Sequence, residues 1–235
     1  MVTIQLRSLT TLSLVFLVTL SSCGKKDAAT TTTDSSSATK SATASPASAT
    51  AMPSGGKYKL KSAIVTSTME MPTLHETGTT VLYFDNYGQK ESLETTAEIK
   101  MGDMTIPMHS IKFNQDGFVY DIDLVKKTGR KIQGGAVMPT NDMSAVTPQM
   151  AAQYNIKKEG TETVAGRECD VISMNNAKMG MTGRVATWNG IGMKSDMVVS
   201  GMPMKMVVTK IEENASIPES KFQVPPDVKI FNVGG

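Results

Sequence analysis

The sequence predicts a mainly β protein of the α+β class, in which antiparallel strands form a sheet with one apolar and one polar face. Three observations support this prediction. Apolar and polar residues alternate with a period of two over many short segments, turn signals rich in Gly, Asn and Asp separate those segments, and helical periodicity is scarce.

The first 22 residues read as a secretory leader rather than as part of the fold. One cation, Arg7, precedes an apolar run over Leu12–Leu20, which is shorter than the ~20 residues that a membrane-spanning helix needs. The run ends in Leu20-Ser21-Ser22-Cys23, which resembles the lipobox of bacterial lipoproteins. This resemblance implies a signal peptide over residues 1–22 and lipidation of Cys23, so we expect a lipid anchor in the membrane.

Charge and cysteine content narrow the function classes. The formal net charge of +2 falls to about +1 once Arg7 leaves with the leader, and so near-neutral a protein has no electrostatic basis for binding nucleic acid. Lipidation of Cys23 leaves Cys169 as the one other cysteine, so no intrachain disulfide is expected. Cys169 shares one side of an apparent strand with Val171, which favours a buried, inert thiol over a reactive or metal-binding one.

A flexible tether is expected between the anchor and the folded part. Residues 23–56 begin with the lipidated cysteine and continue as an Ala-, Ser- and Thr-rich tract, whose lack of apolar periodicity is typical of disorder. About thirty flexible residues have an r.m.s. reach of about 30 Å. Residues 57–235 then have the length of one domain.

Turn signals divide this domain into about nine strand-length segments with period-two patterning. The signals lie at Asp85–Gln89, Asn114–Gly117, Lys126–Lys131, Ala165–Glu168 and Trp188–Gly192. The segment Tyr58–Met71 reads as the first strand. Near the other end, Ile191, Met193, Met197 and Val199 alternate with Lys194 and Asp196 and are expected to share one face.

One helix is expected at "TPQMAAQYN", where Thr147 suits the N-cap, Pro148 suits the first helical position and Asn155 lies beyond the end. It falls in a connection from Gly134 to Asn155, and a connection of that length is uncommon unless it packs as a lid or plug. The segment "PESKF", from Pro218, is expected to form one more short turn.

Two stretches of the C-terminal third carry a resemblance to a known family. Trp188, Gly190, Ile191 and Lys194 lie in a turn and the strand after it, and Ser220, Phe222 and Pro225 follow the final long strand. These stretches resemble the families around the outer-membrane lipoprotein carrier LolA and its receptor LolB. The predicted architecture resembles these families over residues 57–233, but the similar sequence motifs cover only about 50 residues.

This resemblance implies an incomplete, strongly curved antiparallel β-barrel whose open side is plugged by one or two short helices. In the carrier proteins an apolar cavity takes the acyl chains of lipoproteins. Two features depart from the families. The N-terminal amphipathic helix of the carriers is not evident, since Tyr58–Met71 reads as β, and the protruding apolar loop of the receptor is not obvious.

Methionine is unusually frequent, with 18 residues, and many of them lie on the apolar side of an expected strand. An unbranched thioether adapts to irregular contours. The pattern therefore favours plain core packing first, and a surface for a variable apolar ligand is the leading functional hypothesis. The candidate apolar-ligand face consists of Met69, Met71, Met101, Met193, Met197, Met202, Met204 and Met206.

Binding of a soft metal is the alternative use of these side chains, since thioether and imidazole ligands suit Cu(I) and, by the same softness, Ag(I). The candidate ligands are Met202, Met204, Met206, Met108 and His109. The leading interpretation assigns no metal and no cofactor. The other histidine, His75, reads as a turn residue, and His109, near Pro107, is expected at a β-bulge.

No enzymatic activity is expected, because the sequence lacks Gly-x-Ser-x-Gly, His-Glu-x-x-His and a Gly-rich phosphate loop before a helix. The acidic residues Asp121, Asp123, Glu212 and Glu213 read as solvated surface. We therefore expect a non-catalytic lipoprotein of the bacterial envelope, anchored in the outer membrane and facing the periplasm. Its expected partner is a lipid, acyl chain, lipoprotein or other apolar ligand, and a structural or interaction role is a third interpretation.

Overall fold

The computed structural model describes residues 56–134, 136–137, 148–176 and 180–233. All described residues belong to the second of the two units into which contacts between residues divide the chain, Ala51–Gly235. Several predictions fall outside the described residues. They concern the leader, Cys23, nearly all of the tether, Thr147 and much of the Gly134–Asn155 connection. Within the described ranges, none of the helices has the length and apolar character that crossing a bilayer requires.

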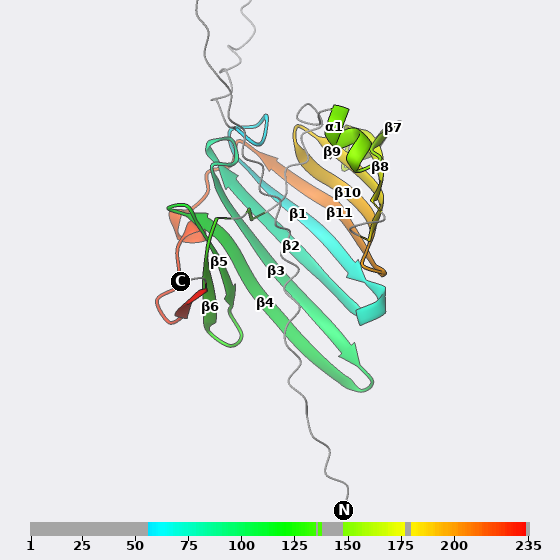
Figure 1. Cartoon of the computed structure of the whole chain (residues 1–235). Coiled ribbons are helices and arrows are strands. Elements are labelled where there is room, and N and C mark those ends of the chain that lie inside the picture. Colours follow the sequence, from blue (N-terminus) through cyan, green and yellow to red (C-terminus); the bar gives the residue numbers. More distant parts are fainter. Residues whose placement is uncertain (1–55, 135, 138–147, 177–179, 234–235) are drawn as a thin grey trace, which may run out of the picture. The chain divides into compact units, whose positions relative to one another are not determined.

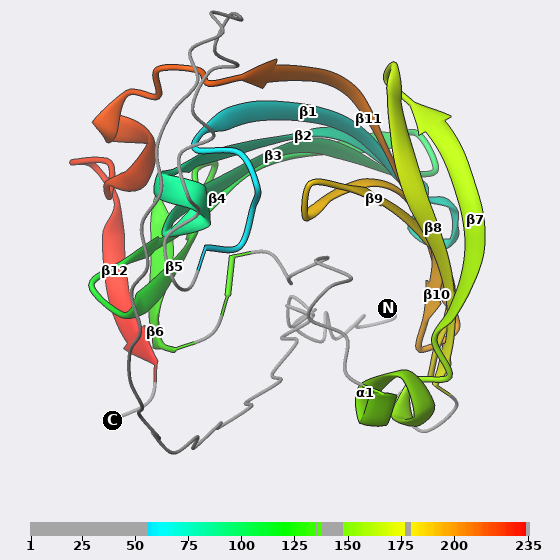
Figure 2. The same ribbon diagram turned by 90° about the horizontal axis from the view of Figure 1, so that it is seen from above.

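The second unit is built on one sheet of twelve strands, which is curved and does not close (Figures 1 and 2). The strands are β1 Ala63–Met71, β2 Glu76–Asp85, β3 Lys90–Met101, β4 Met104–Gln115, β5 Phe118–Asp123, β6 Thr128–Gln133, β7 Lys157–Val164, β8 Arg167–Asn176, β9 Met181–Trp188, β10 Ile191–Val199, β11 Met202–Glu213 and β12 Lys229–Val233. Their order in the sheet is β12-β6-β5-β4-β3-β2-β1-β11-β10-β9-β8-β7. The prediction of a mainly β fold on a curved sheet is confirmed, with more strands than the sequence predicts.

Two pairings join strands that are not consecutive in the chain. β1 pairs with β11 in antiparallel fashion, which makes Met69 the partner of Met206. β12 pairs with β6 in parallel, so the sheet is not wholly antiparallel. The remaining neighbours are joined by hairpins or short connections, and β12 and β7 form the two edges that Figure 2 shows at opposite ends of the arch.

Four of the five turn signals are confirmed as connections between strands, whereas the signal at Lys126–Lys131 is placed too late, since Thr128–Lys131 already belong to β6. Asn189 and Gly190, for example, have φ values of 51° and 81° between β9 and β10, the positive φ values that a tight type I′ hairpin turn requires. The expected helix is confirmed as α1, Pro148–Gln153, and the expected turn near Pro218 as the 3₁₀ helix η5, Glu219–Phe222. Two further 3₁₀ helices, η1 Pro72–Leu74 and η2 Asn86–Gly88, join β1 to β2 and β2 to β3.

The entry to the domain differs from the prediction, because the first strand begins at Ala63 and not at Tyr58. The amides of Lys57 and Tyr58 donate to the carbonyl of Tyr87 in η2, at 2.7 and 3.1 Å, and the amide of Lys59 donates to Asn189 at 3.0 Å. These backbone groups therefore bond to two turns instead of a neighbouring strand.

The largest core cluster joins β1 and β2 to β7–β11 and includes Tyr58, Phe84, Cys169, Met193 and Val208. Cys169 is fully buried, as predicted, and its Sγ donates to the carbonyl of Arg167 at 3.3 Å. A second cluster holds Ile172, Val185, Met197 and Val199. Ile191, Met193, Met197 and Val199 are all buried and alternate with the less buried Lys194 and Asp196, as the sequence predicts. Met193 and Met197 nevertheless belong to different clusters, and the register of β10 with β9 shifts between Gly192 and Lys194.

Candidate functional site

A row of side chains crosses five strands at the centre of the sheet. Met69 on β1 lies directly opposite Met206 on β11 on one side and Gly78 on β2 on the other. On the far side of Gly78, Ala97 on β3 and then Met108 on β4 continue the row. Directly opposite residues on antiparallel strands share a face. A parallel row two residues away runs from Met71 through Glu76 and Ile99 to Ile106.

The same face continues onto β10, because Met204 is the partner of Met197 and Met202 is the partner of Val199. We call this surface the methionine face. It consists of Met69, Met71, Glu76, Gly78, Ala97, Ile99, Ile106, Met108, Met197, Val199, Met202, Met204 and Met206.

The thioethers of the methionine face are neither sealed in the core nor freely solvated. Met69, Met71, Met108, Met202, Met204 and Met206 are all half-buried. Met197 is buried against its cluster, and Ile106 is 41% exposed. The six strands β10, β11 and β1–β4 thus present contiguous apolar side chains, most of which remain partly accessible.

Two of the eight methionines predicted for an apolar-ligand face lie apart from the others. Met193 is fully buried in the main core cluster. Met101 is 52% exposed and pairs with Met104 at the end of the β3–β4 hairpin, two residues beyond the last β2 partner of β3. This hairpin end also exposes Met104, at 63%.

One acidic side chain lies on the methionine face, and sequence reasoning missed it. Glu76 is the partner of Met71 on one side and Ile99 on the other, and it is only 4% exposed. Burial raises the pKa of this carboxyl above its usual value. Among the described residues, none donates a hydrogen bond or forms an ion pair to it. Its position just after the turn residue His75, which has a φ of 49°, gave no sequence signal of burial.

A second buried acid lies where the chain enters the domain. The Glu91 side chain is 4% exposed, and its carboxylate accepts from Lys57 Nζ at 2.6 and 2.8 Å and from the Tyr58 hydroxyl at 2.5 Å. Burial lowers the pKa of Lys57 even though Glu91 opposes the change, and burial together with Glu91 raises the pKa of Tyr58. These three residues fasten the entry segment to β3 and form no accessible site.

His109, one of the predicted metal ligands, lies on the opposite face of β4 from Met108 and belongs to a polar network. Glu94 contacts His109 Nε2 at 2.8 Å and accepts from Lys221 Nζ at 2.8 Å. The expected bulge at His109 is wrong, since the register between β3 and β4 is continuous. Pro107 is tolerated because β5 pairs only with Ser110 and the residues after it, so this part of β4 has a free edge.

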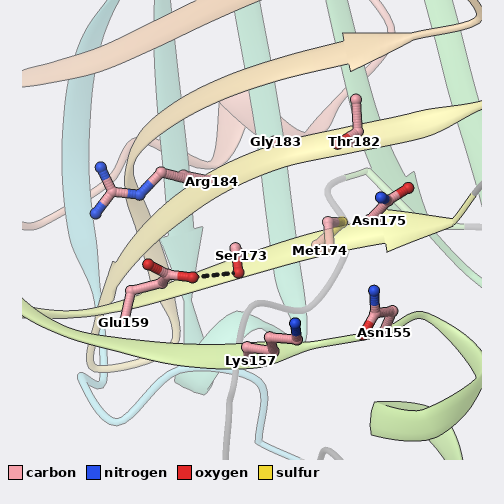
Figure 3. A pocket seen from close by; sticks show the side chains of 9 residues that line it. All are labelled: Asn155, Lys157, Glu159, Ser173, Met174, Asn175, Thr182, Gly183 and Arg184. Carbon is pink, nitrogen blue, oxygen red and sulfur yellow. Dashed lines mark hydrogen bonds between the residues drawn. The ribbon is translucent and has the colours of Figure 1, made fainter.

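An open pocket of about 350 Å³ lies on β7–β9, outside the methionine face (Figure 3). Its lining is mostly polar and consists of Asn155, Lys157, Glu159, Ser173, Met174, Asn175, Thr182, Gly183 and Arg184. The Ser173 hydroxyl donates to Glu159 at 2.5 Å. Lys157 and Arg184 supply positive charge, and the lining has neither a histidine nor a cysteine.

The acidic residues singled out in the sequence take part in surface ion pairs. Asp121 pairs with Arg130 and Asp123 with Lys126, each at 2.8 Å. Glu212 and Glu213 are exposed and pair with Lys210 and Arg167. In the part of the chain that the structure describes, no three His, Cys, Asp or Glu side chains gather as a metal site.

Comparison with known proteins returns neither a matching family model nor a matching curated protein. Among solved structures, an uncharacterized conserved protein from Thermus thermophilus is 10% identical with a TM-score of 0.48, over 74% of this chain and 91% of that one. The MucA/MucB complex of Pseudomonas aeruginosa is 14% identical with a TM-score of 0.42, over 73% of this chain and 58% of that one. A domain described as an outer membrane lipoprotein-sorting protein, from Vibrio parahaemolyticus, is 10% identical with a TM-score of 0.27, over 68% and 88%. At these values the likenesses assign neither a family nor an activity.

Proposed function

We propose that this chain is a lipoprotein of the bacterial envelope, anchored by Cys23 in the outer membrane, whose β domain is a non-catalytic module that binds an apolar ligand such as an acyl chain. The anchor rests on the lipobox-like Leu20–Cys23. The binding role rests on one observation, the half-buried thioethers that adjoin across β1 and β11.

Half-burial is what distinguishes this surface from ordinary core. A core methionine such as Met193 has no exposed area left for a ligand, whereas Met69 and Met206 keep part of theirs. Burying that remaining apolar area under an acyl chain is favourable by about 25 cal/mol per Å². Flexible thioethers can follow the contour of different chains, which suits a binder of mixed lipids.

The binding role can be tested on residues 51–235, which form a compact unit with its own core. The unit would be purified from a bacterial periplasm, and native mass spectrometry with lipid extraction would identify apolar material that co-purifies with it. We expect the variant Met69→Gln/Met206→Gln to lose this material, since an amide of similar length replaces each thioether.

The matched control is Met104→Gln, because Met104 is exposed at the hairpin end away from β1 and β11. Its cargo should equal that of the unchanged protein. Absence of bound apolar material from the unchanged protein, or equal cargo in the double variant, would contradict the binding role. The anchor is tested separately, since Cys23→Ser should abolish incorporation of labelled fatty acid and release the protein from membranes.

Soft-metal binding remains the second candidate because cross-strand pairing brings thioethers close together. Met69 opposes Met206 and Met197 opposes Met204, and Cβ atoms of such partners lie about 4.5–5.5 Å apart. Titration with Cu(I) against a competing chelator would compare Met69→Leu/Met206→Leu and Met202→Leu/Met204→Leu/Met206→Leu with Met104→Leu. Equal affinity in all of these forms would eliminate the methionine face as a metal site.

A further inference from the structure

The Glu76 carboxyl is the one acidic side chain on the methionine face. The residue is 4% exposed, and its row neighbours are the apolar side chains of Met71 and Ile99. Its carboxyl oxygens are not among the fully buried polar atoms that lack a partner, so the carboxyl group keeps the access that a ligand needs. Burying a carboxylate without a partner is costly, so such groups are normally paired or hydrogen-bonded. The described residues provide no such partner for Glu76.

The nearest charged side chains on the neighbouring strands do not pair with the Glu76 carboxylate. Glu98 and Lys100 on β3 alternate with Ile99, so they point to the opposite face of the sheet. Glu70 on β1 alternates with Met71 in the same way, and it is the partner of Lys205 on β11. The charge of Glu76 is therefore left without compensation on its own face.

We propose that the methionine face binds an amphiphile with an apolar tail and a cationic amine head, and that the Glu76 carboxylate holds the amine. This inference rests on the proposed binding of apolar ligands and adds the class of ligand. The tail lies over the thioethers of Met69, Met71 and Met206, and the ammonium group forms a charge-assisted hydrogen bond with the carboxylate. In this arrangement the ligand supplies the missing counter-charge.

Charge complementarity favours an amine over the other head groups. A fatty acid would bring a second carboxylate against Glu76, and a like-charged pair in a largely apolar surrounding is unfavourable. An alcohol can donate one hydrogen bond but carries no charge to balance the carboxylate. An ammonium group provides three donors and the opposite charge.

The test uses three probes with the same tail, namely dodecylammonium and dodecanoate below their micelle concentrations and dodecanol below its solubility limit. Their binding to residues 51–235 would be measured by isothermal titration calorimetry at pH 8. We expect dodecylammonium to bind about tenfold more tightly than dodecanol, and dodecanoate to bind most weakly. Glu76→Gln should erase the preference for the amine over the alcohol, whereas Glu98→Gln, an exposed change on the opposite face, should preserve the preference.

The melting temperature of the ligand-free Glu76→Gln variant distinguishes a binding role from a structural one. If Glu76 stabilised the fold, its replacement would lower the melting temperature. Because burial raises the pKa of Glu76, the ionised form destabilises the fold at pH 8, and Glu76→Gln should raise the melting temperature. A lower melting temperature, equal affinity for amine and alcohol, or an unchanged amine preference in Glu76→Gln would overturn the inference while the apolar binding role stands. Failure of all three probes to bind would overturn both.

Discussion

The hydroxyl of Tyr58 donates a 2.5 Å hydrogen bond to the carboxylate of Glu91, which ties the segment before the first strand to β3. Lys57 Nζ lies 2.6 Å from the same carboxylate. Removal of one partner from a buried ion pair leaves the other charge buried alone. We therefore expect Glu91→Gln to reduce the free energy of unfolding by about 3 kcal/mol, measured by urea denaturation.

The control for this change is Lys210→Ala, which breaks an exposed ion pair with Glu212. Exposed pairs contribute about 0–1 kcal/mol, so its unfolding midpoint should hardly move. Tyr58→Phe should fall between the two variants, because it removes one hydrogen bond and leaves the Lys57 pair intact. Equal stability of Glu91→Gln and the unchanged domain would refute the role of this cluster.

The network around Glu94 should make stability depend on pH. Burial acts to raise the pKa of Glu94, but hydrogen bonds and charge from Lys221 and His109 outweigh it and hold the pKa below its usual value. A depressed carboxyl pKa contributes stability above the pKa of the unfolded chain, and this contribution is lost as the pH falls through the folded value. Glu94→Gln should thus be less stable than the unchanged domain at pH 7, and the difference should vanish as the pH falls through the lowered pKa of Glu94 in the folded domain.

Glu98→Gln serves as the control for that measurement, because Glu98 is an exposed residue of the same strand. Its stability should follow the unchanged domain across the whole pH range in chemical denaturation. A pH-independent loss of stability in Glu94→Gln would show that lost packing, and not the charge network, explains the effect.

Gly78 should resist replacement even by alanine. A Cβ atom at this position would lie 2.6 Å from the carbonyl oxygen of Thr96 and 2.7 Å from the Cβ of Ala97, closer than real contacts allow. The strands β2 and β3 would have to separate, so we expect Gly78→Ala to lower stability by about 1–3 kcal/mol in denaturant titrations. Thr79→Ala, at the exposed next residue, should change stability far less, and a neutral Gly78→Ala would contradict the close approach.

Cys169 should be inert in the folded domain. Burial raises the pKa of its thiol, and the residue has no exposed surface. Reaction with a disulfide reagent such as DTNB at pH 8 should be far slower in native buffer than in urea, because the thiol becomes accessible only when the domain opens. Rapid reaction of the native domain would show that Cys169 is accessible.

Local patterns in the sequence predicted the elements well because each pattern reflects contacts between near neighbours. The alternation around Cys169 and Val171 predicted a buried strand side, and Pro148 predicted the start of α1. Interruptions to a pattern were not predictable in the same way. The register shift between Gly192 and Lys194, for example, depends on how β10 aligns with β9.

The candidate site was predictable only in part. The sequence indicated methionines on apolar strand faces, but it could not indicate which strands adjoin, so Met69 and Met206 appeared as members of separate segments. Met101 and Met193 showed the same alternation as the others, although one lies at an exposed hairpin end and the other in the core. Glu76 was missed altogether, because an acidic residue after a turn ordinarily faces water.

The sequence by itself determined the β class, the turns, the short helix α1 and the inert cysteine, since periodicity and turn chemistry act over a few residues. Only the tertiary structure decided that β1 lies beside β11, that β12 adds to β6 in parallel, and that Glu76 and Glu91 are buried. These features depend on pairings between segments that are distant in the sequence. Which strands pair is decided by the apolar area that the whole core buries, and neither strand alone carries that information.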